Sequence, residues 1–435
     1  MIEIRLKKKK DESLRRFHPW VFSGAIEAMT AQPEEGDWVR VTAHDGSFLA
    51  LGQYQVGSIA VRVFTFEDEA IDDAFLRRRL EVAFELRRRL GLIRPKADDG
   101  RTVNNAYRLV HGEGDGLPGL VVDVYAHTAV MQAHTPGIHR LRRPLAEALV
   151  AVAGAEIRSV YYKSETTLPY KADLDPVNGF LIGGGEALTN GDDGGGGEAL
   201  ANGDNGGGGE RLPGGGGEDG GAEDDIAVEN GLRFHVDWLK GQKTGFFVDQ
   251  RENRSLVEHY AAGRDVLNMF CYTGGFSFYA MRGGARSVHS VDVSAQAIEL
   301  TRRNVELNFP GDPRHEAVCE DAFAYLGRMG DRYDLIILDP PAFAKHKKVL
   351  HNALLGYRRL NAKAFEKIRP GGILFTFSCS QVVTKDDFRC AVFTAAAQSG
   401  RRVRILHQLH QPADHPVNIY HPEGEYLKGL VLYVE

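Results

Sequence analysis

The sequence predicts an α/β protein whose C-terminal half forms a doubly wound, mostly parallel β-sheet. From residue 265 onward, short apolar segments alternate with helix-like segments, which is typical of parallel strands joined by helical crossovers. The last two strands are joined without a helix, so we expect them to supply an antiparallel edge. The seven strands are expected near residues 265–271, 287–292, 316–320, 334–339, 372–379, 403–408 and 427–434.

Two smaller units are expected upstream of this sheet. Residues 1–70 contain short strand signals separated by turns, including Asp45-Gly46, and predict a small β-barrel or sandwich. Residues 71–182 begin with a long helix and then alternate between strands and helices, which predicts a middle α/β domain. A hairpin within residues 226–238 is expected to complete the middle domain, and residues 239–435 form the C-terminal domain.

Residues 183–225 differ in composition from the rest of the chain. They contain nineteen glycines, a Gly-Glu-Ala-Leu or Gly-Glu-Arg-Leu sequence every twelve residues, and almost no large apolar side chains. Such a segment cannot offset its chain entropy, so we expect a disordered insertion; a metal-binding glycine–aspartate repeat is the alternative. It holds eleven acidic residues and one basic residue. The remaining 52 basic and 48 acidic residues therefore carry a net charge of +4, although the whole chain carries −6. That balance permits an RNA partner.

The composition argues against a membrane or disulfide-bonded protein. No apolar run approaches the roughly 18 residues of a membrane span, and the charged N-terminus lacks the apolar stretch of a signal peptide. The cysteines show no C-x-x-C pair and no histidine spacing suited to zinc. We therefore expect a cytoplasmic protein with free thiols, no metal and no membrane contact.

A glycine turn between the first two strands of the sheet is a candidate ligand site. Gly274-Gly275 lets the backbone approach a ligand closely, and Asp292 ends the next strand, where a carboxylate can accept hydrogen bonds from ribose hydroxyls. The alternatives are NAD or FAD, a nucleoside without phosphates, or a structural turn. The dinucleotide fingerprint and a Walker lysine are both absent, which disfavours phosphate-rich ligands.

Later strand ends carry further candidate residues. Asp321 is placed to reach an adenine amino group, although it could equally cap the following helix. Asp339-Pro340-Pro341 stops the fourth strand and presents a carboxylate and carbonyls that could grip a nucleobase, with Phe343 as a stacking face; a plain strand terminator is the alternative. Cys379 ends the fifth strand and is either a buried small hydrophobe or a nucleophile.

A cysteine nucleophile would suit the methylation of cytosine C5. This carbon is too weakly nucleophilic to take a methyl group directly. A thiolate that adds to C6 forms an enamine-like adduct that can do so, and elimination then releases the cysteine.

The N-terminal segment combines basic and aromatic side chains. Arg15, Arg16 and His18 follow a lysine run at residues 7–10 and neighbour Trp20, a mixture that suits phosphate contact and base stacking. A solvated charge run beside core aromatics is the alternative.

Five motifs in the C-terminal half resemble one enzyme family. They are GQKTGFFVDQRENR at 241–254, NMFCYTGGFS at 268–277, LDPPAFAK at 338–345, FSCS at 377–380 and HPEGEYLKG at 421–429. Together they closely resemble class I S-adenosylmethionine-dependent large-subunit rRNA methyltransferases of the RlmI type. Residues 15–24 look like the PUA RNA-binding domain of that family, and 108–123 are similar to its middle domain. The insertion at 183–225 has no counterpart in the family pattern.

The resemblance implies a Rossmann-like class I methyltransferase domain, a PUA-like N-terminal domain, and S-adenosylmethionine as cofactor. It assigns catalysis to Cys379 and Asp339, with a base not identified in the sequence. Lys243 and Arg251 are expected to contact either the cofactor carboxylate or the RNA backbone. The implied cofactor-binding residues are Gln242, Lys243, Thr244, Phe270, Tyr272, Thr273, Gly274, Gly275, Asp292, Asp321 and Asp339. The expected RNA-binding residues are Pro340, Pro341, Phe343, Lys345, Arg251, Arg15, Arg16, His18 and Trp20.

The expected partner is large-subunit rRNA, and a homodimer is allowed. Three alternatives remain open. A related family with similar motifs methylates guanine N7 and would not need Cys379. The chain could also be a non-catalytic RNA-binding assembly factor, or an NAD-dependent oxidoreductase, which the missing dinucleotide fingerprint disfavours.

Overall fold

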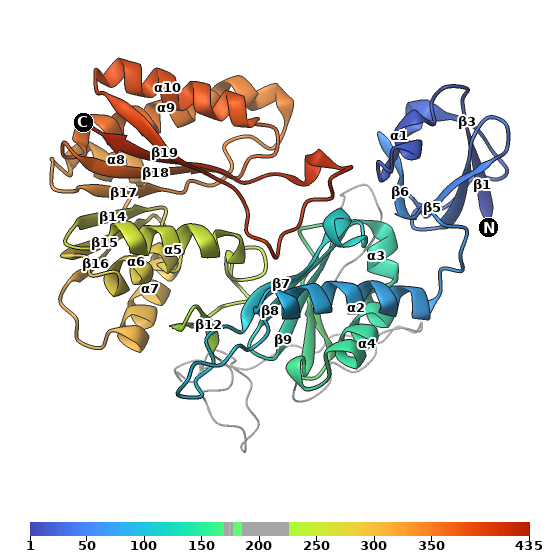
Figure 1. Ribbon diagram of the computed structural model, residues 1–435, viewed down its shortest axis with the longest axis horizontal. Coiled ribbons are helices and arrows are strands. Elements are labelled where there is room, and N and C mark those ends of the chain that lie inside the picture. Colours follow the sequence, from blue (N-terminus) through green and yellow to red (C-terminus); the bar gives the residue numbers. More distant parts are fainter. Residues whose placement is uncertain (169–173, 175–176, 185–225) are drawn as a thin grey trace, which may run out of the picture.

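The computed structural model describes residues 1–168, 174, 177–184 and 226–435. The insertion that was expected to be disordered lies, from residue 185 on, outside the described residues. The described residues form four β-sheets, and Figure 1 shows three globular units with the N-terminus and the C-terminus in different units. Within these residues no helix is long and apolar enough to cross a membrane.

The N-terminal unit is a six-stranded sheet in the order β2-β6-β5-β4-β1-β3 (upper right in Figure 1). The predicted hairpin around Asp45-Gly46 is present as the antiparallel pair β4–β5. Alternate strand residues such as Ile4, Val39 and Val61 form its small apolar core. Its elements are β1 (Ile2–Leu6), α1 (Glu12–Arg15), β2 (Trp20–Phe22), β3 (Ile26–Met29), β4 (Trp38–Thr42), β5 (Phe48–Tyr54) and β6 (Ile59–Thr65).

The middle unit is a five-stranded sheet in the order β11-β10-β9-β8-β7 that packs against helices. Its long helix starts where the sequence predicts it, because the Asp72 carboxylate accepts a hydrogen bond from the Phe75 amide. Helices α2 and α4 pack against each other. The elements are α2 (Asp73–Arg89), β7 (Ala106–His111), β8 (Leu120–Tyr125), β9 (Thr128–Ala133), α3 (Pro136–Arg140), α4 (Arg142–Ala153), β10 (Ser159–Tyr162) and β11 (Gly179–Ile182).

A separate hairpin, β12 (Ala227–Glu229) and β13 (Leu232–Phe234), connects the middle unit to the C-terminal unit. Its backbone bonds to Asn105 and Val103 of the middle unit, while its apolar side chains join the core beneath the large sheet. The hairpin therefore forms its own two-stranded sheet and does not extend the middle sheet.

The C-terminal unit is the predicted seven-stranded sheet, in the order β16-β15-β14-β17-β18-β20-β19. Its central strands are buried along their whole length, as expected for strands covered by helices on both faces. The strands are β14 (Asp265–Met269), β15 (Ser287–Asp292), β16 (His315–Cys319), β17 (Leu335–Leu338), β18 (Gly372–Ser378), β19 (Val403–Leu409) and β20 (Lys428–Val434). The helices are α5 (Arg251–Tyr260), α6 (Gly275–Arg282), α7 (Ala295–Asn308), α8 (Ala322–Arg328), α9 (Leu350–Lys367) and α10 (Lys385–Ser399).

The expected antiparallel edge is wrong in one respect. Strand β20 is antiparallel to both of its neighbours, but it inserts between β18 and β19, so the edge strand β19 runs parallel to the others. Burial explains this order, because β20 is almost entirely buried whereas β19 is largely exposed. Residue periodicity alone does not order two adjacent strands.

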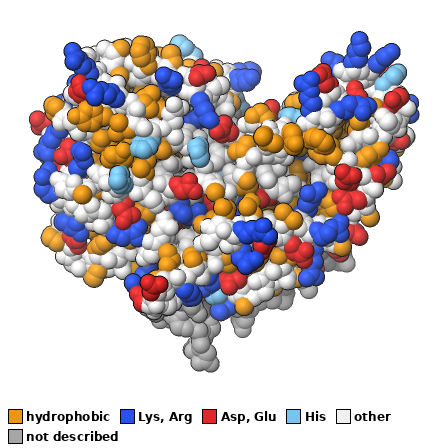
Figure 2. All heavy atoms as spheres, in the orientation of Figure 1, with side chains coloured by type: hydrophobic (Ala, Val, Ile, Leu, Met, Phe, Trp, Pro, Cys, Tyr) orange, Lys and Arg blue, Asp and Glu red, His pale blue; other side chains and the backbone are white. Residues whose placement is uncertain are grey.

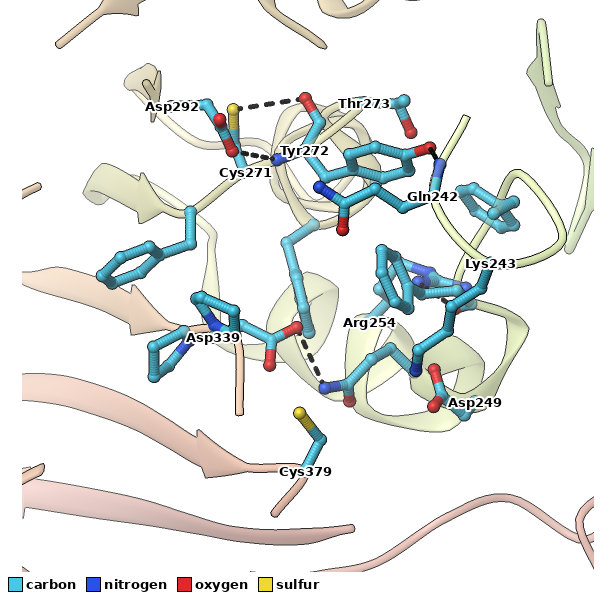
Figure 3. Close-up of a pocket in the computed structure, with 18 of the residues that line it drawn as sticks. Gln242, Lys243, Asp249, Arg254, Cys271, Tyr272, Thr273, Asp292, Asp339 and Cys379 are labelled. Atoms are coloured by element: carbon cyan, nitrogen blue, oxygen red, sulfur yellow. Dashed lines mark hydrogen bonds between the residues drawn. The ribbon is translucent and has the colours of Figure 1, made fainter. Parts of the chain in front are cut away.

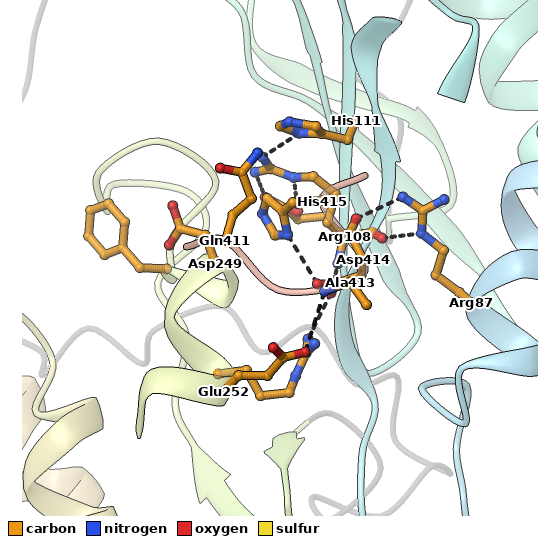
Figure 4. Close-up of polar contacts among 12 residues, drawn as sticks. Arg87, Arg108, His111, Asp249, Glu252, Gln411, Ala413, Asp414 and His415 are labelled. Atoms are coloured by element: carbon orange, nitrogen blue, oxygen red, sulfur yellow. Dashed lines mark hydrogen bonds and ion pairs between the residues drawn. The ribbon is translucent and has the colours of Figure 1, made fainter. Parts of the chain in front are cut away.

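The segment between β19 and β20, residues 410–427, leaves the sheet and reaches the other two units (Figure 1). We call it the strap. Figure 4 shows Ala413 to His415 of the strap passing between α5 and the middle sheet. The Asp414 carboxylate accepts hydrogen bonds from the Arg108 amide at 3.0 Å and from the Arg251 guanidinium at 2.9 Å. Arg87 donates to the Asp414 carbonyl at 2.7 Å, so one strap residue links three elements.

We predict that Asp414→Ala destabilises the protein strongly. Asp414 is fully buried, and its loss leaves the charge of Arg251 uncompensated by one of its two carboxylate partners. Breaking a buried pair in this way costs about 3–5 kcal/mol. Urea unfolding measures the change in the free energy of unfolding. The exposed Asp331→Ala is the control, with an expected change within about 0.5 kcal/mol; similar midpoints for both variants would contradict the prediction.

Candidate active site

A pocket opens at the carboxyl ends of β14, β15, β17 and β18 (Figure 3), the position where parallel α/β sheets bind ligands. In Figure 3, Asp292 lies at one end of the pocket, Cys379 at the other, and Asp339 between them. The pocket is lined by Gln242, Lys243, Phe246, Phe247, Asp249, Gln250, Arg254, Phe270, Cys271, Tyr272, Thr273, Gly275, Phe276, Asp292, Val293, Asp339, Pro340, Pro341, Cys379 and Leu427.

The glycine turn after β14 is tightly constrained. Gly274 has a φ of +85°, and a Cβ atom there would lie 2.6 Å from the Phe278 ring and 2.8 Å from the Thr301 methyl group. Phe270 and Tyr272 also have positive φ angles, which side chains rarely adopt. The Asp292 carboxylate accepts a hydrogen bond from the Tyr272 amide at 3.0 Å and holds this strained turn in place.

The loop 241–245 forms a second wall of the pocket and is held from two sides. The Tyr272 hydroxyl accepts a hydrogen bond from the Gln242 amide at 3.1 Å and donates one to the Gly245 carbonyl at 3.0 Å. From the middle unit, the Lys163 ammonium donates to the carbonyls of Trp238 and Gly241 at 2.8 and 2.6 Å. The middle unit therefore shapes the pocket although it lies outside the seven-stranded sheet.

A third contact fixes the same loop. The Thr244 hydroxyl donates to the Asp123 carboxylate at 2.6 Å and lies 3.0 Å from the Tyr125 hydroxyl. Thr244 is consequently turned toward the middle unit and does not line the pocket. Lys243, with a φ of +49°, does line the pocket, and its ammonium lies 4.8 Å from the centroid of the Phe247 ring.

Two carboxylates in the pocket, the buried Asp249 and the half-buried Asp339, have pKa values shifted in opposite directions. Burial, reinforced by the nearby charge of Asp249, raises the pKa of Asp339 to about 7, although Gln250 donates a hydrogen bond to Asp339 at 3.1 Å. For Asp249, the charges of Lys243 and His415 and a hydrogen bond from Tyr426 outweigh burial and lower the pKa. Near neutral pH, Asp249 is therefore ionised while Asp339 is protonated in about half of the molecules.

Asp249, just before helix α5, is of a residue type that often caps helices, but it does not cap this one. The N-cap position is Gln250, whose side chain makes no capping bond, and Asp249 lies in a 3-10 turn before it. One Asp249 oxygen accepts from the Tyr426 hydroxyl at 2.7 Å, and the other is buried without a hydrogen-bond partner. A buried carboxylate oxygen with a free lone pair in a ligand pocket is available to a bound cation or donor.

Cys379 directly follows β18 and lines the pocket near Asp339. Burial and the charges of Asp339 and Asp249 raise the pKa of its thiol to about 11, while the charge of Lys243 opposes this rise. The free protein therefore carries Cys379 as a thiol at neutral pH.

Most of the predicted cofactor residues come together in this pocket, but several predicted residues lie elsewhere. Asp321 caps α8 by accepting from the amides of Phe323 and Ala324, and it does not line the pocket. Arg251 is buried against Asp414 and Glu229. Gly274 and the half-buried Phe343 are not among the lining residues. The centroids of the Phe343 and Tyr357 rings are 4.6 Å apart. Lys345 is exposed.

The predicted RNA-binding residues of the N-terminal unit divide into two groups. Arg15 and Arg16 are exposed and pair with acidic residues one helical turn earlier. His18 and Trp20 lie against the strap, because the centroids of their rings are 5.6 and 4.3 Å from that of His421. Trp20 Nε1 also donates to Glu113 of the middle unit at 2.9 Å.

Sequence reasoning missed Lys163, Gln250 and the pocket role of Asp249. Asp249 and Gln250 belong to the quoted motif at 241–254, so their position in that motif was an available signal. Lys163 had no such signal, since its contact with the loop 241–245 depends on how the middle unit docks. Among the described residues, no cluster of three His, Cys, Asp or Glu side chains is arranged to hold a metal ion.

The fold and the pocket define an S-adenosylmethionine-dependent methyltransferase with an N-terminal PUA-like domain. The family model for S-adenosylmethionine-dependent methyltransferases matches residues 217–423, and the PUA-like domain model matches 4–66. A methyltransferase of Streptococcus mutans superposes with a TM-score of 0.76 at 20% identity over the full length of both chains. Another structure, described as SMU.776 complexed with SAH, superposes with a TM-score of 0.77 at 21% identity, also over both full chains.

Two relatives of known name identify the family. Ribosomal RNA large subunit methyltransferase I of Shewanella denitrificans is 39% identical over 100% of this chain and 99% of its own length. The protein of the same name from Alteromonas mediterranea is 37% identical over 99% of this chain and 98% of its own length. The chain belongs to the ribosomal RNA large subunit methyltransferase I family.

The pocket fits S-adenosylmethionine by its own chemistry. Asp292 lines the pocket and can present carboxylate oxygens to ribose hydroxyls, and the unpartnered oxygen of Asp249 suits an ammonium group. S-adenosylmethionine supplies an electrophilic methyl group.

We predict that Asp292→Asn weakens S-adenosylmethionine binding. Hydrogen bonds to a charged group contribute about 1.5–3 kcal/mol, which corresponds to a loss of affinity of about 10- to 100-fold. Titration calorimetry gives the dissociation constant, and a thermal melt checks that the turn at Tyr272 remains folded. Glu299→Gln, an exposed carboxylate change on the following helix α7, is the matched control and should alter affinity less than about threefold. Equal affinities for both variants would exclude Asp292 as a cofactor ligand.

Proposed function

We propose that this protein methylates C5 of a cytosine in large-subunit rRNA through a covalent adduct with Cys379. The observation that carries the proposal is the position of Cys379, which lines one pocket together with Asp339 and several residues predicted to bind the cofactor. The names of the relatives support an rRNA substrate and, with it, a cytoplasmic enzyme.

The reaction needs a nucleophile because cytosine C5 does not attack a methyl group by itself. The Cys379 thiolate forms a bond to C6, which makes C5 electron-rich enough to take the methyl group. The C5 proton then leaves, its bonding electrons restore the C5–C6 double bond, and the bond from C6 to sulfur breaks.

Asp339 is suited to hold the base edge and favour the addition. With a pKa of about 7, its carboxyl group is protonated in a large fraction of molecules and can donate to N3 of the ring. Electron density that flows into the ring when sulfur adds to C6 is then stabilised at N3. Pro340 and Pro341 follow Asp339 and line the same wall.

Lys243 is the cation that supports the thiolate. Its charge lowers the pKa of Cys379 against burial and two carboxylates, so removing the charge would make ionisation harder. We therefore assign Lys243 to the electrostatics of the reacting groups, rather than to the RNA backbone.

The substrate is expected to approach through the notch between the N-terminal unit and the methyltransferase unit. Figure 2 shows this notch at the top of the molecule, with Lys and Arg side chains on both of its sides. Basic side chains there favour the binding of a polyanion. His421 of the strap contacts Trp20 of the N-terminal unit, so the strap connects the two sides of the notch.

We predict that Cys379→Ala abolishes methyl transfer. The assay uses labelled S-adenosylmethionine and large-subunit rRNA from cells that lack the gene, followed by nucleoside analysis. A loss of at least about 100-fold is expected, since the covalent step is removed. RNA that contains 5-fluorocytidine should form a denaturation-stable adduct with the unaltered protein and none with the variant.

Cys390→Ala is the matched control, because Cys390 is exposed on α10 and should leave transfer unchanged. Methylation that persists in the Cys379→Ala variant would overturn the proposal and favour N-methylation, as in the guanine-N7 alternative. Absence of S-adenosylmethionine binding in the unaltered protein would favour a non-catalytic RNA-binding factor.

A further inference from the structure

Lys428, the first residue of β20, is a buried lysine next to the segment that carries Cys379. Its side chain donates a hydrogen bond to the Ser380 carbonyl at 2.6 Å, and Ser378 is its direct cross-strand partner. Only 6% of Lys428 is exposed, and it forms no ion pair with a carboxylate of the described residues. Buried lysines are usually paired, so this one invites a functional explanation.

Residues at the end of β18 and at the start of β20 line two different cavities. Cys379 and Leu427 line the cofactor pocket, whereas Gln381 and Lys428 line a second cavity of about 560 Å³. The second cavity lies between the rim of the methyltransferase sheet, the strap and Trp20, and its size is within the range of about 300–1,000 Å³ of ligand sites. Lys428 therefore lines a different cavity from Cys379, while its hydrogen bond to the Ser380 carbonyl holds its ammonium beside the segment that carries the thiol.

The last step of cytosine C5 methylation needs a base on the face of the ring opposite the methyl donor. A ring carbon that has gained a methyl group on one face is tetrahedral, and its hydrogen points toward the other face. The base must therefore approach from the face opposite the methyl donor. Asp339 is already assigned to N3 of the ring, and Asp249 accepts a hydrogen bond from Tyr426, so another group is needed for this proton.

We propose that Lys428 is the base that removes the C5 proton after methyl transfer. The inference rests on the proposed function. The neutral amine takes the proton, the electrons of the C5–H bond form the C5–C6 double bond, and the bond from C6 to sulfur breaks to release the Cys379 thiolate. The Lys428 ammonium then returns its proton to water through the second cavity.

The surroundings of Lys428 support this role. Burial, together with the charge of Lys385, lowers its pKa to about 8, while Cys379 and Glu425 act in the opposite direction. A lysine with this pKa is neutral in a useful fraction of molecules near neutral pH, whereas an ordinary lysine is almost fully protonated. Glu425 is itself paired with Lys385 at 2.5 Å, so it does not neutralise Lys428 by a direct contact.

The test follows the C5 proton and the covalent adduct separately. Large-subunit rRNA labelled with tritium at cytosine C5, from cells that lack the gene, is incubated with S-adenosylmethionine and unaltered protein, Lys428→Met or Lys428→Arg. Tritium release measures proton removal, and denaturing gels measure the protein–RNA adduct. The arginine variant keeps the charge and can still reach Ser380, but it cannot accept a proton.

We expect both variants to form the methylated adduct and to accumulate it, with tritium release at least about 100-fold slower than in the unaltered protein. The exposed Lys363→Met on α9 is the control and should change both measurements less than threefold. Calorimetry with S-adenosylmethionine verifies that each variant is folded.

Three results would overturn the inference. Tritium release within about threefold of the unaltered protein in either Lys428 variant excludes Lys428 as the base. Loss of the adduct in both variants with intact cofactor binding would make Lys428 a positioning residue for Cys379. If the unaltered protein itself forms no adduct with 5-fluorocytidine RNA and releases no tritium, the proposed function fails, and this inference fails with it.

Discussion

The buried carboxylate of Asp414 holds the middle unit and the methyltransferase unit in one arrangement. It accepts hydrogen bonds from the Arg108 amide on the middle sheet and from the Arg251 guanidinium on α5. Because the group is buried, losing either bond would lower the stability of the fold substantially. Helix α5 follows directly after Asp249 and Gln250, which line the pocket. The position of the pocket wall therefore depends on a strap residue that is more than 160 residues away in the chain.

The middle unit contributes to the pocket through the backbone of another segment. Lys163 and Asp123 of the middle unit form hydrogen bonds with the loop 241–245, and Tyr272 forms one with it from the methyltransferase unit. Lys243 in this loop has a left-handed backbone conformation, which is unfavourable without such support. Two sets of contacts thus keep one ammonium group beside Asp249, Asp339 and Cys379, where its charge affects the pKa of all three.

The end of β18 separates two chemical environments. On the cofactor side, burial raises the pKa of Asp339 and Cys379, so both groups can hold a proton near neutral pH. On the other side, burial lowers the pKa of Lys428, so this group can release one. The same desolvation acts in opposite directions on acids and amines, and it provides a proton donor and a proton acceptor at adjoining ends of the paired strands β18 and β20.

The sequence by itself determined the seven strands, the glycine turn, Asp292 at a strand tip, and the motifs around Asp339 and Cys379, because these features are local in the chain. Strand periodicity and turn residues are set by neighbours, and the carboxyl ends of parallel strands necessarily meet at one edge. Only the tertiary structure decided that β20 lies between β18 and β19 and that Asp321 and Arg251 lie outside the pocket. It also decided that Lys163 contacts the loop 241–245 and that Lys428 contacts the segment after Cys379. Those outcomes depend on docking between distant segments, where desolvation and pairing of buried charges select one arrangement that no local pattern encodes.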